Sequence, residues 1–210
     1  MALPLRVRGA TASVSGKRRL GPIDLDIGPS GATVIIGPNG AGKTTLLKLL
    51  HGTTKPASGT INWAIKTSAA RKVQGFVFQR PVMLRRSVLQ NIAYPLLAHG
   101  SSQTTAKTQA REWAKRVGLQ DLVDQPARLL SGGEQQKLAL ARALISKPKV
   151  LFLDEPCAAL DGRATREIET LLNEAKTAGT RIILSTHDLG QARRLADEVV
   201  FMLKGHVHEH

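Results

Sequence analysis

The feature that most constrains the fold is a glycine-rich segment that matches the pattern G-x-x-x-x-G-K-[ST] in full: Gly37-Pro38-Asn39-Gly40-Ala41-Gly42-Lys43-Thr44. Residues 32–36, just before it, form an apolar run typical of a buried strand, and residues 44–50 have helical periodicity. In this strand–loop–helix context the glycines let backbone N–H groups face phosphate oxygens, and the helix N-terminus adds partial positive charge. The sequence therefore predicts a nucleotide site.

The polar residues of this loop have separate expected roles. We expect Lys43 to reach the β- and γ-phosphates, the Thr44 hydroxyl to coordinate Mg²⁺, and Thr45 to add a phosphate contact. The alternative is a glycine-rich turn with a solvated lysine, and the full match in its required context argues against it.

A second acidic segment follows another buried-type strand, since residues 150–153 lead into Asp154-Glu155-Pro156. Asp154 can hold the Mg²⁺ shell through water, and Glu155, one residue closer to the nucleotide, can orient or deprotonate the attacking water. The alternative is a solvent-exposed acidic turn. The phosphate loop in the same chain argues for the functional interpretation.

Strand-like and helix-like apolar patterns alternate along the 210 residues, which indicates an α/β fold with a largely parallel sheet. We expect one domain over 1–210, in which 1–85 and 131–210 form the α/β core and about 86–130 form a helical insertion. The expected strands cover 23–27, 32–36, 73–78, 150–153, 181–185 and 198–203, with the last closing the sheet. The expected helices cover 44–50, 131–146, 163–178 and 189–196, besides those of the insertion.

Composition narrows the class of protein. Lys and Arg exceed Asp and Glu by 30 − 16 = 14, which suits nucleic acid, an anionic lipid surface or an anionic ligand. Aromatic residues are only 3%, which disfavours base-stacking platforms. The single cysteine, Cys157, excludes an internal disulfide and fits a reducing compartment. We find no apolar run long enough to span a bilayer and no secretory signal over residues 1–8.

The segment Leu130-Ser131-Gly132-Gly133-Glu134-Gln135-Gln136 precedes the expected helix 131–146. Ser131 and Glu134 have the spacing of a capping box, and Gly132 and Gly133 leave backbone amides open to an anion. A capped helix start is a sufficient explanation of this segment alone. In combination with the other motifs, however, the chain from about residue 4 to 203 resembles the ATP-binding cassette (ABC) ATPases, whose signature reads LSGGQ or LSGGE.

The resemblance implies a P-loop NTPase core, ATP and Mg²⁺ as cofactors, and roles for further residues. Gln79 matches the glutamine that reaches Mg²⁺ and the attacking water and connects the core to the helical insertion. Ser131, Gly132 and Gly133 match residues that bind the γ-phosphate of ATP held by the opposite subunit. Asp161 matches an aspartate that bridges the two subunits, and His187 a histidine that contacts the γ-phosphate. Two copies of the chain are then expected to sandwich two ATP molecules and hydrolyse them when closed.

The chain departs from the family in its expected adenine contact. An aromatic residue usually precedes the strand 23–27 by about nine positions, and here that place falls near Val14 and Ser15. We therefore expect weaker ATP affinity or weak discrimination between ATP and GTP. Cys157 is interpreted as a small buried filler and not as a nucleophile. His206, His208 and His210 have the spacing of one strand face and could bind Zn²⁺ or Ni²⁺, although an exposed C-terminal tail is the favoured interpretation.

The resemblance also implies partners. A single cassette without a membrane span requires a separate polytopic permease, so we expect a cytoplasmic subunit peripheral on the inner face of the cell membrane, with a substrate-binding protein in the same system. Residues 77–88 resemble tungstate-type oxyanion importers, with Met83 and Leu84 as an apolar docking surface and Arg85 and Arg86 beside it. Import of phosphate or polar amino acids, or lipid-directed transport, is the alternative for the substrate.

Two other classes of protein are weighed against the transporter. An ABC ATPase acting on nucleic acid or ribosomes is expected to carry tandem cassettes or a coiled-coil insertion, which this chain lacks, so we expect no direct nucleic-acid partner. A P-loop kinase or GTPase is disfavoured because those classes do not use the signature motif, Asp161 or His187.

Overall fold

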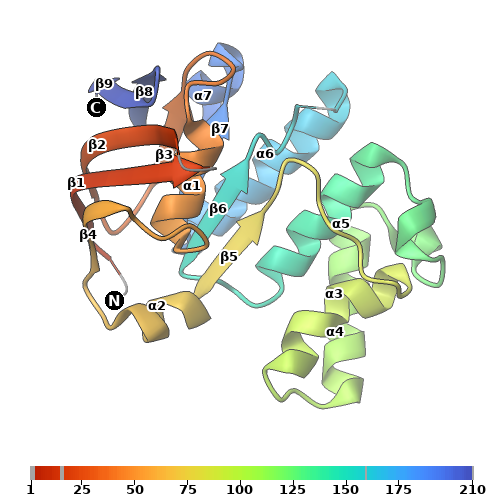
Figure 1. The fold of residues 1–210 in the computed structure, drawn as a ribbon. Helices are drawn as coiled ribbons and strands as arrows, with labels where there is room; N and C mark the ends of the chain where they lie inside the picture. Colours follow the sequence, from red (N-terminus) through yellow and green to blue (C-terminus); the bar gives the residue numbers. More distant parts are fainter. Residues whose placement is uncertain (1–2, 15–16, 159, 210) are drawn as a thin grey trace.

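The computed structural model describes residues 3–14, 17–158 and 160–209. Its centre is a six-stranded sheet with the strand order β5-β6-β7-β3-β8-β9 (Figure 1). The first five strands in that order are parallel and the last is antiparallel to its neighbour: β5 (Gln74–Val77), β6 (Val150–Asp154), β7 (Arg181–Thr186), β3 (Ala32–Ile36), β8 (Glu198–Leu203) and β9 (His206–Glu209).

A second, antiparallel sheet has the order β2-β1-β4, formed by β1 (Leu5–Val14), β2 (Lys17–Ile27) and β4 (Ser58–Trp63). In β2 the apolar residues Ile23, Leu25 and Ile27 are buried while Asp24 and Asp26 face solvent. Helix α1 (Lys43–His51) lies between the two sheets, and its four leucines join both in one apolar core (Figure 1).

Helices cover the other face of the central sheet. They are α5 (Gly132–Leu144), α6 (Gly162–Thr177) and α7 (Leu189–Leu195), and a second apolar core joins them to that sheet. The same core extends to α3 (Val88–Ala98) and α4 (Gln103–Arg116), which lie beside α5 at the right of Figure 1. The short helix α2 (Thr67–Lys72) and 3-10 turns at Gln120–Leu122 and Ala127–Leu129 complete the fold. None of the described helices combines the length and apolar character needed to cross a bilayer.

The six predicted strands are all present, but β8 does not close the sheet as predicted. Its neighbour β9 pairs with it, so residues 206–209 form a strand and not a free tail, although His206 and His208 are exposed as predicted. Two further strands, β1 and β4, were not predicted. In β1 shifts of register between Val7 and Ala12 interrupt the two-residue period, and β4 is largely solvent-exposed, so neither has a clear alternating pattern.

Candidate nucleotide-binding and catalytic site

The glycine-rich loop between β3 and α1 is fixed by backbone contacts from the sheet edge. The Gly205 N–H donates to the Ala41 carbonyl at 2.9 Å, so the β8–β9 turn supports the loop. Gly37 has a φ of 152° and a Cβ there would lie 2.2 Å from the Met202 carbonyl oxygen, while Gly42, with a φ of 104°, caps α1. A side chain at Gly37 would therefore displace β8, which explains why the loop needs glycine at this position.

The loop forms one wall of a cavity of about 690 Å³. The remaining wall comes from residues that follow three different strands of the parallel sheet, where the strands' carboxyl ends meet. The lining residues are Asn39, Gly40, Ala41, Gly42, Lys43, Thr44, Thr45, Gln79, Glu155, Ala158 and His187. Of the predicted site residues, Gly37, Pro38 and Asp154 lie beside this wall and do not line the cavity.

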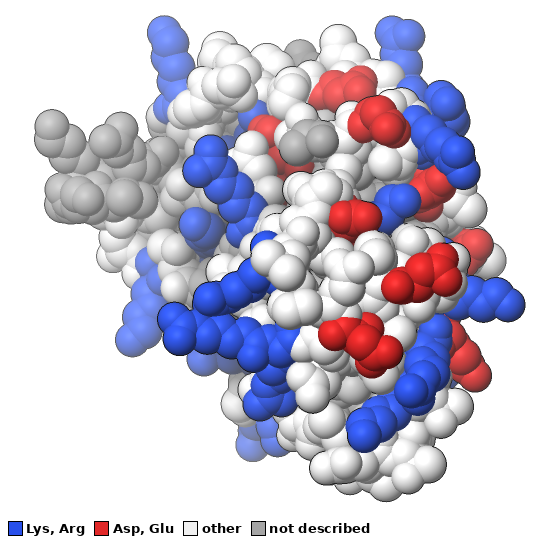
Figure 2. Space-filling model, turned by 90° about the vertical axis from the view of Figure 1, so that its right-hand side faces the viewer, with Lys and Arg blue, Asp and Glu red and all other residues white. Residues whose placement is uncertain are grey.

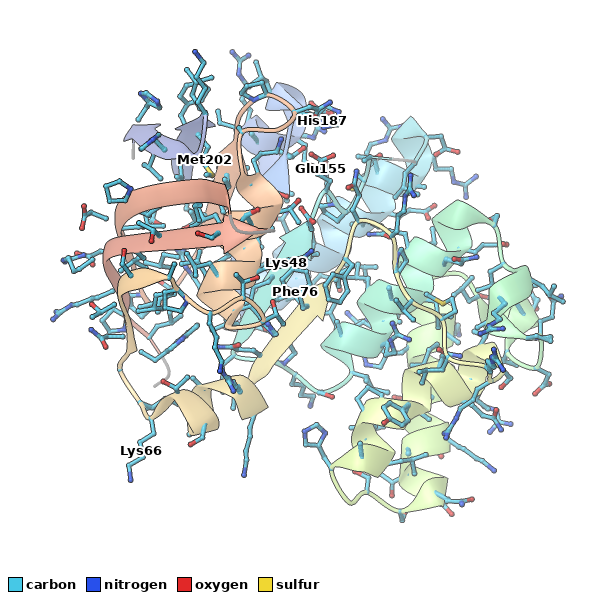
Figure 3. All side chains as sticks on the ribbon, in the orientation of Figure 1. Lys48, Lys66, Phe76, Glu155, His187 and Met202 are labelled. Atoms are coloured by element: carbon cyan, nitrogen blue, oxygen red, sulfur yellow. The ribbon has the colours of Figure 1, made fainter. Side chains whose placement is uncertain are left out.

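Glu155 is the centre of the polar network in this cavity. Its carboxylate lies 3.4 Å from Lys43 Nζ, 3.1 Å from His187 Nδ1 and 3.4 Å from Gln79 Nε2. Figure 3 shows Glu155 and His187 close together above the end of β6. The Glu155 backbone has a φ of 45°, an unfavourable conformation for a residue with a side chain, and its N–H donates to the Ser185 carbonyl and hydroxyl. The fold thus holds a strained residue where several predicted catalytic groups converge.

Lys43 is almost entirely buried, and its ammonium donates to the Gly37 carbonyl at 2.9 Å and the Pro38 carbonyl at 3.3 Å. It therefore places a positive charge inside the curve of the glycine-rich loop. Among the described residues, the Glu155 carboxylate is the one carboxylate within 4.0 Å of this charge, so the site can accept further anionic oxygens. The loop, the helix N-terminus and Lys43 together fit the phosphates of a nucleoside triphosphate.

Oxygen ligands suitable for Mg²⁺ lie at the bottom of the same site. Asp154 is buried, and its Oδ1 accepts hydrogen bonds from the Thr44 hydroxyl at 2.9 Å and the Ser185 hydroxyl at 2.8 Å. Mg²⁺ prefers one or two protein oxygens together with phosphate oxygens and water. A hydroxyl and a carboxylate beside the phosphate loop fit that donor set.

The signature residues and Asp161 do not line this cavity within the same chain. Ser131 caps α5, and the predicted capping box is present: its hydroxyl accepts from the Glu134 N–H, and the Glu134 carboxylate accepts from the Ser131 N–H at 2.8 Å. The Ser131 hydroxyl also donates to the Glu134 carboxylate at 2.7 Å, and this hydrogen bond, together with that from the Ser131 N–H, lowers the pKa of Glu134. Asp161 caps α6 through the Ala164 N–H at 2.7 Å, which lowers its pKa too. Apart from its chain neighbours and its own helix backbone, no atom of the described residues lies within 4 Å of where a Cβ on Gly132 would stand, so this helix start is open to an approaching group.

The aromatic residue that the family usually places against adenine is absent from its expected position near Val14 and Ser15. Ser15 lies outside the described residues, as do the side-chain surroundings of Val14. No Phe, Tyr or Trp is found among the described residues that line the cavity. The prediction of weak base discrimination therefore stays open to test.

Cys157 lies next to this site, on a second cavity of about 490 Å³ that shares Glu155 and His187 with the first. Burial raises the pKa of its thiol to about 11, so very little thiolate exists at neutral pH. This agrees with a packing role. On β9, His206 and His208 are both exposed, whereas His210 lies outside the described residues. Among the described residues no cluster of three or more metal-ligating side chains is present.

The predicted apolar docking surface needs correction. Met83 is only 8% exposed and belongs to the core, and Leu84 is partly buried. Val82, at 69%, and Leu129, at 74%, are instead the two most exposed large apolar side chains among the described residues, and they lie on segments joined by a hydrogen bond from the Ala127 N–H to the Arg86 carbonyl. Val82 could have been found from the sequence, since neighbours in an extended segment face opposite ways. Leu129 has no such signal.

Exposed basic side chains lie near these two residues in the sequence, namely Arg80, Arg85, Arg86 and Arg128. Basic side chains also spread over the face that carries the helices at the right of Figure 1, with acidic side chains grouped among them (Figure 2). The positive charge of the chain is therefore distributed over the surface and is not confined to the nucleotide cavity.

The similarity to known proteins agrees with this geometry. The family described as "ABC transporter" matches residues 20–158. The tungstate uptake system ATP-binding protein TupC of Peptoclostridium acidaminophilum is 40% identical over 179 residues, which are 84% of this chain and 84% of that protein. A phosphate import ATP-binding protein of Natronomonas pharaonis is 37% identical and covers 98% of this chain and 78% of its own length.

Solved structures show the same fold. The cbiO1 protein of Clostridium perfringens, part of the ABC transporter complex cbiONQ, superposes with a TM-score of 0.84 at 32% identity, over 100% of this chain and 88% of that one. A dimeric ATP-binding cassette in a post-hydrolysis state, bound to ADP and Pi, gives a TM-score of 0.88 at 25% identity, over 98% and 97% of the two chains. With its phosphate loop, acidic strand end and α/β fold, the chain belongs to the ABC transporter family and is an ATP-binding ATPase subunit of the importer type.

Proposed function

We propose that this ATPase drives import of an oxyanion such as tungstate through a separate membrane permease, as a Mg²⁺-dependent homodimer at the inner face of the cell membrane, with a substrate-binding protein in the same system. The observation that carries the catalytic part is the convergence of Lys43, Glu155, Gln79 and His187 on one cavity. We also propose that residues 86–130 are a helical subdomain inserted into the α/β core.

The chain's own residues then divide the chemistry. Backbone groups of the loop 37–44 and the Lys43 ammonium bind the β- and γ-phosphates, with Thr45 beside them. Thr44 and Asp154 would hold Mg²⁺, with Gln79 beside it, and the ion would supply positive charge to offset that of the phosphates. Glu155 orients a water and accepts its proton, and His187 donates a hydrogen bond toward the γ-phosphate.

A second copy completes the site. Ser131, Gly132 and Gly133 lie outside the cavity of their own chain, and the open helix start at Gly132 offers N–H groups to an anion. In a head-to-tail pair this helix start contacts the γ-phosphate bound to the partner copy, and Asp161 bridges the two copies. Hydrolysis then depends on dimer closure. The dimeric cassette bound to ADP and Pi supports this arrangement.

Nucleotide selectivity tests the adenine side of the site. Without an aromatic ring, base stacking that contributes about 1–3 kcal/mol is lost, and little else distinguishes adenine from guanine. We expect the Kd values for ATP and GTP to agree within about tenfold, measured by displacement of a fluorescent ATP analogue. Tight binding of ATP with no measurable binding of GTP would contradict this expectation.

The permease is proposed to dock on the surface formed by Val82 and Leu129 and the four arginines around them. The proposal takes Val82 and Leu129, on hydrogen-bonded segments, as parts of one apolar patch rimmed by charged residues, the kind of surface that marks interaction sites. A permease segment that is apolar on one side and acidic on the other fits this surface by charge. The arginines also suit the anionic inner leaflet close to such a complex.

The substrate is tested by uptake in the source cells. With the gene deleted we expect loss of tungstate uptake, restored by the wild-type gene and not by Glu155→Gln. The proposal for tungstate rests on the similarity to the tungstate uptake protein, and the phosphate import relative names the chief alternative. If tungstate uptake is unchanged and phosphate or amino-acid uptake is lost, the proposed substrate is wrong but the proposed role in import stands. Unchanged uptake of all of them would favour an ABC ATPase acting on nucleic acid or ribosomes.

A further inference from the structure

A completely buried asparagine holds the docking segment Val82–Ser87. Asn91, in α3, accepts a hydrogen bond from the Leu84 N–H through Oδ1 at 3.0 Å. Its Nδ2 lies within 3.0–3.3 Å of the carbonyl oxygens of Leu84, Arg86 and Ser87. One side chain thus binds the backbone of the segment at several points, which fixes its path and the outward direction of Val82.

Arg142 connects the same segment to α5. Its guanidinium donates to Asn91 Oδ1 at 3.1 Å and to the Val82 carbonyl at 2.8 Å. Within the part of the chain that the structure describes, it forms no ion pair, so its charge is placed against neutral oxygens. Such a placement is costly unless the hydrogen bonds are well made, and only the planar fork of arginine reaches both oxygens.

The other half of α5 carries the residues proposed to contact the second copy. The helix starts at the signature residues, and Lys137 pairs with Glu167 of α6 at 2.5 Å. Helix α6 in turn starts after Asp161. At about 1.5 Å per residue, α5 is a rigid connection of about 20 Å between the docking segment and the dimer-facing helix starts. A displacement of one end of α5 therefore displaces the other end.

We propose that Asn91 and Arg142 are positioning residues that couple the docking segment 82–87 to the signature end of α5. The inference rests on the proposed ATP-bound homodimer, and it assigns to this pair the mechanical connection between nucleotide state and permease contact. Because coupling between two sites is reciprocal, ATP-driven closure must alter the docking segment if the permease is to alter closure. Neither residue lines the nucleotide cavity.

Hydrogen exchange of the full-length chain tests this, with Glu155→Gln as the parent so that ATP is retained. In the parent we expect Mg-ATP to change deuterium uptake in peptides covering both 131–137 and 82–87. Arg142→Lys keeps the charge but loses the fork. We expect it to keep the change at 131–137 and to lose more than half of the change at 82–87. Arg111→Lys, on the exposed side of α4, is the matched control and should behave as the parent does.

Asn91→Asp is the second variant, since it is nearly isosteric and keeps the acceptor for Leu84 and Arg142 but loses the amide donors. The same loss at 82–87 is expected, with thermal unfolding recorded for every variant. The coupling is overturned if both variants show the same Mg-ATP-dependent change in deuterium uptake at 82–87 as the parent. It is also overturned if the parent shows a change at 131–137 and none at 82–87. If the parent does not bind ATP at all, the proposed function is overturned instead. A separate measurement of ATP binding distinguishes this outcome from a failure of the coupling.

Discussion

Replacement of Glu155 by Gln is expected to lower kcat for ATP hydrolysis by about 10²–10⁴-fold, the contribution of a well-placed general base. The amide keeps the size of the side chain and can still contact His187 and Gln79, but it cannot take a proton from water. The substitution also removes the negative charge 3.4 Å from Lys43 Nζ, which competes with phosphate for that cation. We therefore expect ATP affinity to stay the same or to rise.

Steady-state phosphate release and equilibrium ATP binding measure the two effects separately. Glu112→Gln is a suitable control, because this carboxylate is exposed on α4 and distant in sequence from every motif. Because the Glu155→Gln protein binds ATP without hydrolysing it, its dimer should also accumulate when ATP is added, which size-exclusion chromatography would detect. A Glu155→Gln protein that keeps more than a tenth of the wild-type kcat would assign the proton transfer to another group.

Replacement of Arg181 by Met is expected to lower the free energy of unfolding by about 3 kcal/mol, near the lower end for breaking a buried ion pair. Arg181 is completely buried at the start of β7, where its guanidinium contacts the Glu198 carboxylate and the Thr33 hydroxyl, each at 2.5 Å, and the Ser30 carbonyl. The loss is placed at the lower end because the Glu198 side chain is 39% exposed and can be rehydrated.

Urea unfolding followed by circular dichroism measures this loss. The double variant Arg181→Met with Glu198→Gln should recover part of it, because the carboxylate is then no longer left beside an apolar side chain. Arg193→Met, on an exposed position of α7, provides the matched control. A loss below about 1 kcal/mol would mean that the pair contributes no more than a surface ion pair does.

Much of the site was predictable because each motif is a short continuous segment whose flanking residues already indicate the local secondary structure. The loop 37–44 and the strand ends at Asp154 and His187 are contiguous segments whose pattern already indicates strand, turn or helix start. A parallel sheet brings such strand ends to one edge, so the meeting of Lys43, Glu155 and His187 follows from the order of elements. The capping box at Ser131 is likewise local.

Other features were not predictable because they depend on pairing between distant segments. Strand β9 exists because β8 offers it an edge, and the pattern of residues 206–209 is too short to show this. Met83 and Val82 are equally apolar in the sequence, and only packing on α3 and α5 buries the first and exposes the second. The contact of Arg142 with Val82 spans 60 positions, and no local signal announces it.

By itself, the sequence determined the chemistry of this protein: a triphosphate loop, an acidic strand end and a signature helix start, each defined within a few consecutive residues because backbone conformation and capping are local. Only the tertiary structure decided which of these groups share a cavity and which face outward toward a second copy. It also decided that a partly buried arginine and a completely buried asparagine connect the docking segment to α5. Those outcomes depend on side-chain burial and long-range hydrogen bonds, whose energies are set by neighbours far apart in the chain.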